Sequence, residues 1–489
     1  MPETTVYEIR PLGWENDPEE EKLKLSMLDI FSVQAYNPFT LFFKLSDNER
    51  PRALDILKKG LERTLAQCRH MVGTIEQDDK TYDCFFTKKR DTTGKLVVKY
   101  FGPEDGVPSM QEIEKAHYAS SFLDVSKFNV EGLSATEAPE NHPSQKPIST
   151  AFQANFIPGG LVFVTSQHHY TNDLAGWANF ARQLGENCAA IANNTAPPPW
   201  DPANLDASCW TAPDIPDEAK VDAPPSPPPN GMERDTSVLL LHMPKSKASE
   251  LKRLASPEGS DAMPKWISTY DAMCAILWRI LTRHRVPLYC PDPDAEAPLA
   301  LESVNLRSRV DPPLPPRQQR NIMWVMPSNV LPDPFTAREV AAQESEFPLA
   351  RLAAKIRTMT SAMNKEMVLQ FLAKTAPIRD KTRLFLRPNS FPPLSFFVTD
   401  WRDADLRDVD FGFGRPCAFR HIADSPDSMK GISVVAVYPP RPSENPDEGF
   451  EFLVSVENDI LDAVLEDPDL KNFFDFRGFE IKTEAKEAS

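Results

Sequence analysis

The chain has 489 residues, of which 41% are hydrophobic and 26% are charged, and its formal net charge is −17. This length allows two or three globular domains. Nucleic acids and anionic membranes both require a basic footprint, so the acidic balance predicts neither as a partner.

No segment approaches the roughly 18 apolar residues of a membrane-spanning helix. The first 23 residues lack the basic head and apolar stretch of a secretory signal. These features predict a cytoplasmic protein. The seven cysteines are widely spaced, odd in number and without a C-x-x-C pair, which is typical of reduced thiols. We therefore expect no disulfide framework and no metal site.

The N-terminal part of the chain predicts one helix among several strands. Residues 25–45 are apolar and aromatic and end in a predicted buried strand. Residues 50–68 place leucines at helical spacing behind a proline-containing start, namely Leu54, Leu57, Leu61 and Leu65. Three short strands of a meander are expected next, at 71–77, 82–89 and 95–101. Residues 151–167 then indicate a hairpin that turns at 158–160.

The second strand of that hairpin leads into two histidines. The stretch VFVTSQHHYTNDLAGW, residues 162–177, passes from an apolar run to His168, His169 and Asp173. The residues that follow predict a helix from 174 to about 192, with Asp173 near its N-cap. Its apolar stripe comprises Leu174, Trp177, Phe180, Leu184 and Cys188. A strand therefore ends, and a helix begins, at the histidines.

Residues 196–231 are rich in proline, aspartate and alanine and show no sustained period. We predict an extended linker there, between an N-terminal domain at 1–195 and a C-terminal domain at 232–489. The C-terminal part again mixes strands and helices, in the order strand 237–243, helix 268–285, strand 298–307, helical stretch 336–375, strand 395–401 and a hairpin of 432–440 with 450–457.

The histidine pair has two interpretations. A histidine at a strand end is most often a structural residue, and Asp173 can be explained as an N-cap worth about 1 kcal/mol. The carboxyl ends of strands that lead into helices are, however, where α/β sheets hold ligands, and a histidine there titrates near neutrality. The chain has no G-x-S-x-G elbow, P-loop, H-E-x-x-H or Rossmann fingerprint. The residues by themselves indicate a candidate acid/base site and leave the reaction open.

Two motifs together resemble a known family. H-x-x-x-D at 169–173 and D-F-G-F-G at 410–414, in that order and at that distance, resemble the BAHD acyltransferases, whose signatures are H-x-x-x-D and D-F-G-W-G. Further family-like stretches lie between residues 25 and 476, including LSMLD, FIPGG, ISTYDAMCAILWR, VNLRSRVDPPLP and TDW. Leu174 and Phe413 replace a glycine and a tryptophan usual in plant members. In this the chain is similar to the fungal branch that includes trichothecene 3-O-acetyltransferases.

The resemblance implies an α/β fold of two chloramphenicol-acetyltransferase-like domains, with mixed sheets flanked by helices and the active site at the domain interface. It implies an acyl-CoA-dependent O-acyltransferase that moves an acyl group, most simply acetyl, from acyl-CoA to a hydroxyl of a secondary metabolite. Acyl-CoA is then a co-substrate, no cofactor is bound permanently, and a small-molecule acceptor is the other partner. A monomer is expected, because the two domains complete the site.

The resemblance also implies roles for the site residues. His169 is expected to be the general base, while His168 points to the opposite face, because adjacent strand residues do so. Asp173 is expected to support the loop by pairing with Arg307. Thr399 and Trp401 match positions whose hydroxyl and indole N–H approach the reacting centre, where a tetrahedral oxyanion needs donors. The alternative is that Trp401 is a core aromatic residue.

The remaining motif residues are expected to be structural or to bind CoA. Asp410, Gly412 and Gly414 are interpreted as a rigid turn, with Arg415 pairing with Asp410. The CoA phosphates are expected at a basic cluster and at a helix start, which attracts anions; the candidates are Lys245, Lys247, Lys252, Arg253, Ser268 and Thr269. A solvated face is the alternative interpretation of the lysines.

Two other functions stay open. A free-standing condensation-type enzyme takes its acyl group from a carrier protein, but its motif H-H-x-x-x-D-G is at odds with Leu174 and with D-F-G-F-G. A catalytically silent binding protein on the same fold is the third hypothesis. Intact His169 and Asp173 disfavour it.

Overall fold

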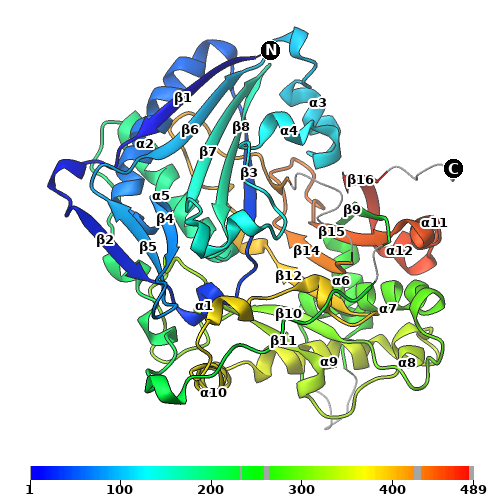
Figure 1. The fold of residues 1–489 in the computed structure, drawn as a ribbon. Coiled ribbons are helices and arrows are strands. Elements are labelled where there is room, and N and C mark those ends of the chain that lie inside the picture. Colours follow the sequence, from blue (N-terminus) through cyan, green and yellow to red (C-terminus); the bar gives the residue numbers. More distant parts are fainter. Residues whose placement is uncertain (1, 232–233, 258–263, 423–430, 484–489) are drawn as a thin grey trace, which may run out of the picture.

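The computed structural model describes residues 2–231, 234–257, 264–422 and 431–483. In this part of the chain the strands form three sheets (Figure 1). One has the order β1-β6-β7-β8-β3-β13, the second has the order β11-β10-β12-β14-β15-β9-β16, and the small third has the order β2-β5-β4. The two large sheets mix parallel and antiparallel pairs and carry helices, which confirms the predicted fold class.

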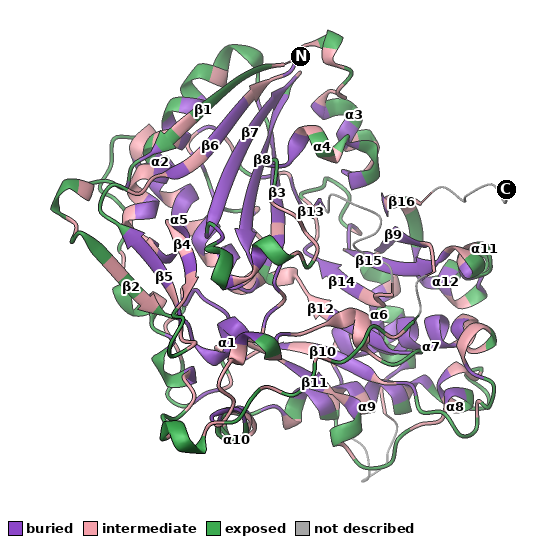
Figure 2. Ribbon diagram, viewed as in Figure 1, coloured by how far each residue is buried: buried purple, intermediate pink, exposed green. Residues whose placement is uncertain are grey.

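The first large sheet comes mainly from the N-terminal half of the chain. Its strands are β1 (Glu3–Ile9), β6 (Gly94–Tyr100), β7 (Thr150–Ile157), β8 (Gly160–His168), β3 (Tyr36–Lys44) and β13 (Ala418–His421). β7 and β8 form the predicted hairpin. Every residue of these two strands is buried (Figure 2). Burial of both faces explains why apolar residues do not strictly alternate with polar ones along these strands.

Two helices cover one face of this sheet. α2 (Arg50–Gln67) and α5 (Leu174–Ala192) confirm the two predicted helices, and their apolar stripes share one core with the sheet. The helices approach so closely that a Cβ at Gly60 would lie 2.2 Å from the Sγ of Cys188. Only glycine fits at this crossing. The packing fixes α5, and with it the residues at its N-terminus.

The three strands predicted over 71–101 are present, but they do not form the predicted meander, because the third pairs elsewhere. β4 (Thr74–Gln77) and β5 (Cys84–Lys89) pair with each other, and β5 pairs with β2 (Glu20–Lys24), in the small sheet. β6 instead joins the large sheet between β1 and β7. A period of two along the sequence predicts that a strand exists, but it does not predict the strand's partner. Here β6 pairs in parallel with β7, more than 50 residues away, and not with the neighbouring β5.

The second large sheet comes from the C-terminal half. Its strands are β11 (Met323–Pro327), β10 (Ala300–Asn305), β12 (Phe396–Asp400), β14 (Val434–Tyr438), β15 (Phe450–Glu457), β9 (Thr236–Met243) and β16 (Asp475–Ile481). The long helices of this half are α6 (Lys245–Leu254), α7 (Thr269–Tyr289), α9 (Leu349–Ala362) and α10 (Lys365–Thr375). The predicted helical stretch 336–375 is broken, because Pro348 and Asn364 each begin a new helix.

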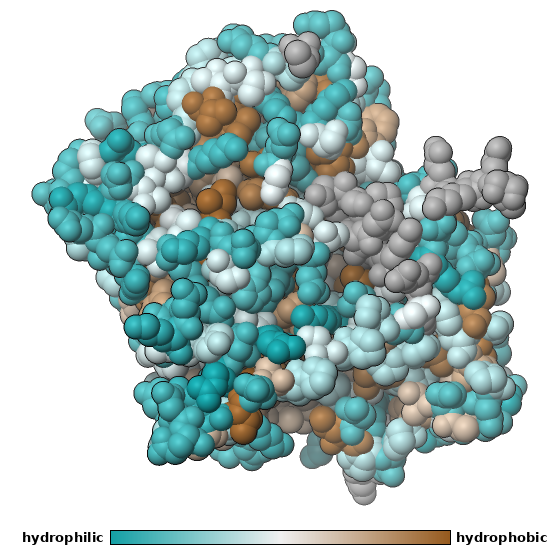
Figure 3. Space-filling model, viewed as in Figure 1, coloured by the Kyte–Doolittle hydropathy of each residue, from teal (hydrophilic) through white to brown (hydrophobic). Residues whose placement is uncertain are grey.

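The short helices fill the connections between these elements. They are α1 (Met27–Ile30), α3 (Met110–Lys115), α4 (Val125–Phe128), α8 (Ala337–Ala341), α11 (Leu461–Leu465) and α12 (Pro468–Phe473). No helix within the described ranges is both long and apolar enough to cross a membrane. The face shown in Figure 3 is mostly hydrophilic, with apolar residues in small groups.

One strand of the C-terminal half belongs to the first sheet. β13 pairs with β3 at the edge of that sheet. From it, the buried guanidinium of Arg420 reaches the second sheet and pairs with Glu451 on β15 and Glu480 on β16. The two sheets are therefore connected by a buried ionic cluster. The boundaries 1–195 and 232–489 remain a prediction, and β13 crosses them.

The proline-rich stretch 196–231 lies between α5 and β9 and forms several short 3-10 turns. It packs against the body of the protein, since Trp210 is completely buried. The carbonyl of Asn204 accepts a hydrogen bond of 2.8 Å from the backbone N–H of Gln319. The crossing therefore contacts the segment around Gln319 in the C-terminal half.

Candidate functional site

His169 lies directly after β8, at the carboxyl end of the strand. Its backbone N–H donates to the carbonyl of Ala35 at 2.9 Å, which continues the pairing of β8 with β3 by one residue. His168 lies on the other face, where its Nε2 is 3.0 Å from the carbonyl of Asn141 and its ring contacts Tyr36. The opposite orientation predicted for the two histidines is confirmed.

The His169 ring is half-buried. Its Nδ1 is buried without a hydrogen-bond partner in the described residues, so Nε2 is the nitrogen that a ligand can reach. Burial lowers the pKa of His169, while its own backbone carbonyl, Asp173 and Asn321 oppose that shift. A lowered pKa keeps the ring neutral at pH 7, which is the state that accepts a proton.

Asp173 has both of its predicted roles: it is the N-cap of a helix and it pairs with Arg307. It is the N-cap of α5, where its Oδ1 accepts from the backbone N–H of Gly176 at 2.7 Å. It also forms the predicted ion pair with Arg307, through two hydrogen bonds of 2.9 Å. The backbone N–H of Ile322 donates to its Oδ2 at 2.9 Å. The carboxylate thus joins α5 to the C-terminal half and does not face His169's accessible nitrogen.

The segment 318–322 holds the histidine loop from the C-terminal side, and sequence reasoning missed it. The Asn321 amide donates to the carbonyls of His169 and Tyr170, at 2.8 and 3.1 Å. Arg320 forms a completely buried ion pair with Asp29 of α1. Asp29 lies in the family-like stretch LSMLD, the one sequence signal that could have indicated this contact. The loop is therefore fixed by hydrogen bonds from both halves of the chain.

Thr399 and Trp401 lie at the carboxyl end of β12 and are half-buried. The indole N–H of Trp401 donates to the Oγ1 of Thr399 at 3.1 Å. This contact corrects the prediction that both groups face the reacting centre as donors, because the indole hydrogen is already used. The Thr399 hydroxyl is left as the donor that can turn towards a ligand. The Trp401 ring packs on Phe39, Phe419 and Tyr438, so it is also a core aromatic residue.

The D-F-G-F-G motif packs against α5. Gly412 has a φ of +74°, and a Cβ there would lie 2.4 Å from the Cβ of Ala192. The side chains of Phe411 and Phe413 contact Phe43 of β3. Asp410 accepts a hydrogen bond of 2.7 Å from the backbone N–H of Gly412.

Two further expectations concern the end of this motif. The predicted pair of Asp410 with Arg415 is not formed between these two described residues, and Arg415 is exposed. Gly414 has a φ of +151°, a backbone conformation that glycine adopts easily. The rigid-turn interpretation therefore rests on the two glycines rather than on an ion pair.

The residues expected at the CoA phosphates have other partners. The Lys245 and Lys247 side chains of α6 contact the carbonyl of Pro446 and the carboxylate of Glu250. Ser268 is the N-cap of α7, and its Oγ accepts from Arg357 at 2.9 Å. Thr269, with Lys252 and Arg253 of α6, completes the predicted set. Their role towards CoA stays a prediction.

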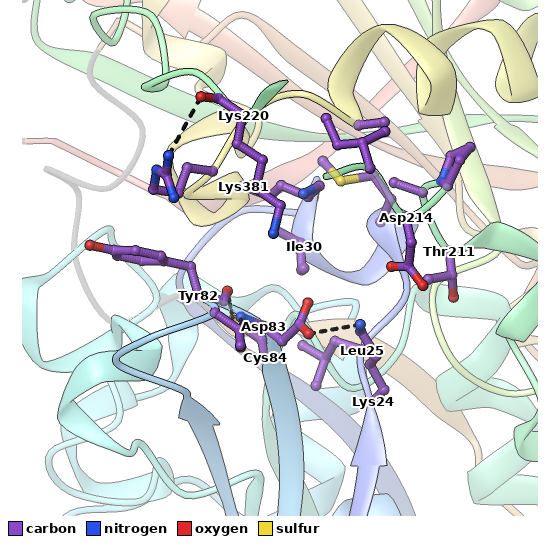
Figure 4. A pocket seen from close by; sticks show the side chains of 17 residues that line it. Lys24, Leu25, Ile30, Tyr82, Asp83, Cys84, Thr211, Asp214, Lys220 and Lys381 are labelled. Atoms are coloured by element: carbon purple, nitrogen blue, oxygen red, sulfur yellow. Dashed lines mark hydrogen bonds and ion pairs between the residues drawn. The ribbon is translucent and has the colours of Figure 1, made fainter. Parts of the chain in front are cut away.

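A cavity of about 730 Å³, open solvent included, lies beside the small sheet (Figure 4). Its wall is formed by the ends of β2 and β5, the proline-rich crossing and the residues after α10, with four cations, Lys24, Lys220, Arg379 and Lys381. None of the residues predicted from the two motifs lines it. The cavity and the histidine loop are therefore separate features.

Comparison with known proteins identifies the family. The family model described as "Transferase family" matches residues 117–470, and a model of the trichothecene 3-O-acetyltransferase-like N-terminal domain matches residues 35–188. The chain belongs to the transferase family. This membership confirms the resemblance to BAHD enzymes and the predicted enzyme class, an acyltransferase.

Individual relatives agree with the family. Acetyltransferase FGR3 of Gibberella zeae is 44% identical over 98% of this chain and 95% of its own length. Trichothecene 3-O-acetyltransferase TRI101 of Fusarium sporotrichioides is 24% identical over 79% of this chain and 84% of its own. The crystal structure of F. graminearum TRI101 with coenzyme A and T-2 mycotoxin covers 94% of this chain and 100% of its own, with a TM-score of 0.72 and 19% identity. Vinorine synthase, at a TM-score of 0.62 and 18% identity, covers 98% and 100%.

Proposed function

We propose that the protein transfers an acetyl group from acetyl-CoA to a hydroxyl group of a small secondary metabolite, with His169 as the general base. The 44% identical relative is named an acetyltransferase, which supports acetyl as the transferred group. The name of TRI101 and the titles of its complexes with coenzyme A and trichothecenes support the donor and the kind of acceptor.

The reaction begins when the neutral Nε2 of His169 takes the proton of the acceptor hydroxyl. The acceptor oxygen attacks the thioester carbonyl carbon and forms a tetrahedral oxyanion. The intermediate then collapses, the carbon–sulfur bond breaks, and the imidazolium of His169 returns its proton to the departing sulfur. A positioned base of this kind is typically worth about 10²–10⁴ in rate.

The Thr399 hydroxyl is the proposed donor to the oxyanion. Trp401 holds the Thr399 oxygen through its indole N–H, so the hydroxyl hydrogen is free to point to the reacting carbonyl. Loss of one such donor commonly costs about 10²–10³ in rate. Trp401 acts through Thr399 in this scheme and is a positioning residue.

The observation that carries the proposal is how His169 is held. Its carbonyl accepts from Asn321, its backbone N–H pairs with Ala35, and the residue is not completely buried. Asp173, four residues later, is tied to Arg307 and to the backbone of Ile322. A structural histidine needs no such support from both halves of the chain while its ring stays accessible.

The test is incubation of the purified protein with acetyl-CoA, longer acyl-CoAs and a panel of hydroxylated metabolites, with free thiol and ester product measured together. We expect thiol and acetyl ester to appear in equal amounts and only when an alcohol is present. Thiol release without ester would mean hydrolysis. Transfer only from an acylated carrier protein would support the condensation-type enzyme instead.

A further inference from the structure

A second histidine lies beside the proposed site and has no part in the reaction described above. His421 is the last residue of β13, the strand of the C-terminal half that pairs with β3. Its ring centroid is 5.5 Å from that of Trp401 and 5.6 Å from that of Phe39. Its side chain is half-buried, like those of His169, Thr399 and Trp401. His421 is therefore only partly buried, and its ring contacts a residue of the site.

The register of β3 places His421 near His169. On one side of β3, Ala35 pairs with His169 through the backbone. On the other side, Phe39 pairs with His421. Asn37 lies midway between Ala35 and Phe39, and residues two apart on a strand point to the same face. Two residues span about 7 Å along a strand, so Asn37 lies between the two histidines.

Asn37 and His421 form one hydrogen-bonded pair. The Nε2 of His421 is 3.2 Å from the Oδ1 of Asn37. An amide oxygen only accepts, so Nε2 carries the hydrogen. Burial, and then the charge on His169, lower the pKa of His421 to about 4, so the ring is neutral at pH 7 and its Nδ1 is an acceptor.

The pair keeps one donor and one acceptor unused. Within the described residues, no other side chain bonds the Asn37 amide nitrogen or the His421 Nδ1, and neither atom is among the buried atoms without a partner. A hydroxyl group both donates and accepts. The chemistry of the pair therefore matches a hydroxyl that lies some ångströms from the one His169 deprotonates.

We infer that Asn37 and His421 bind a second hydroxyl group of the acceptor, so that the enzyme selects polyhydroxylated acceptors over those with one hydroxyl. The inference rests on the proposed function, because it needs His169 as the base for the first hydroxyl. In a site built to hydrogen-bond a hydroxyl, an acceptor that lacks it leaves the pair without partners, which costs binding.

The test compares two probes of the same shape, trans-cyclohexane-1,4-diol and trans-4-methylcyclohexanol, in the acetyl-CoA thiol-release assay. The wild-type protein should prefer the diol by roughly tenfold in kcat/KM, beyond the factor of two for its equivalent hydroxyls. His421→Phe keeps the ring packing with Trp401 and removes both nitrogens, and Asn37→Leu removes the amide. Both variants should reduce the preference to about the twofold statistical value, by raising KM for the diol.

The control is His284→Phe on α7, whose Nε2 contacts Asp467 at 2.8 Å; it should keep the wild-type preference. A merely structural role of His421 would change both probes equally and leave their ratio unchanged, which would overturn the inference. Equal wild-type rates with the two probes, in a protein that acetylates other alcohols, would overturn it as well. Thiol release with no alcohol at all would instead overturn the proposed function.

Discussion

Replacing Asp173 by asparagine tests the support beneath the histidine loop. The carboxylate accepts four N–H groups: Gly176 N at 2.7 Å and Arg307 Nη2 at 2.9 Å on Oδ1, and Arg307 Nη1 and Ile322 N, both at 2.9 Å, on Oδ2. Asparagine keeps one oxygen and turns an NH₂ group towards the other donors. Two N–H groups lose their acceptor, and Arg307 loses its counter-charge.

The structure sets the size of the effect. Only 8% of the Asp173 side chain and 10% of the Arg307 side chain are exposed, so solvent does little to compensate. Breaking a buried ion pair by removing one partner costs about 3–5 kcal/mol. We expect Asp173→Asn to lower the free energy of unfolding by about that amount, and to reduce kcat because the loop that carries His169 loses its anchor.

The assay combines denaturant unfolding, followed by circular dichroism, with thiol release under conditions where the variant is folded. The control is Asp459→Asn, which breaks an exposed ion pair with Arg234 and should cost less than about 1 kcal/mol. If Asp173→Asn unfolds like the wild type and keeps full activity, the pairing with Arg307 does not support the site and the reasoning is refuted.

Three further outcomes are expected. Thr399→Val should lower kcat about 10²–10³-fold and Trp401→Phe less, roughly tenfold; an undiminished kcat in both would remove this pair from the oxyanion site. Because burial lowers the pKa of His169, kcat/KM should fall with decreasing pH only below pH 6.5, the ordinary pKa of histidine. A decline in kcat/KM that already starts above pH 7 would contradict His169 as a base with a lowered pKa. Gly412→Ala should lower the free energy of unfolding by about 3 kcal/mol, because the residue has a positive φ and its new Cβ would contact Ala192. The control Gly13→Ala also has a positive φ but lies in open space, and it should cost about 1 kcal/mol. Equal costs for the two variants would exclude the contact with Ala192 as a cause.

The sequence predicted those parts of the fold that depend on neighbouring residues. The helix at 174–192 and its N-cap, the hairpin of β7 and β8 and the strand that carries Thr399 all follow from local periodicity and turn residues. The pairing of Asp173 with Arg307, 134 residues apart, came only from the resemblance, because no periodicity connects two distant side chains.

The parts that the sequence did not predict depend on distant partners. β13 is four residues long and pairs with β3, more than 370 residues away, so no local pattern places His421 near the site. Local patterns likewise do not predict that Asn321 bonds the carbonyl of His169, or that Arg320 pairs with Asp29, because each contact joins the C-terminal half to the N-terminal half. The lysines of α6 were predicted from charge alone, and charge does not specify which way a surface side chain points.

The central claim is that His169 removes the proton of the acceptor. The most direct measurement compares acceptor-dependent thiol release from acetyl-CoA by the wild-type protein and by His169→Ala, with the thermal unfolding of both recorded under the same conditions. We predict a loss of at least about 10²-fold in kcat with an unchanged, cooperative unfolding transition. Retained turnover in a folded His169→Ala variant would contradict the account.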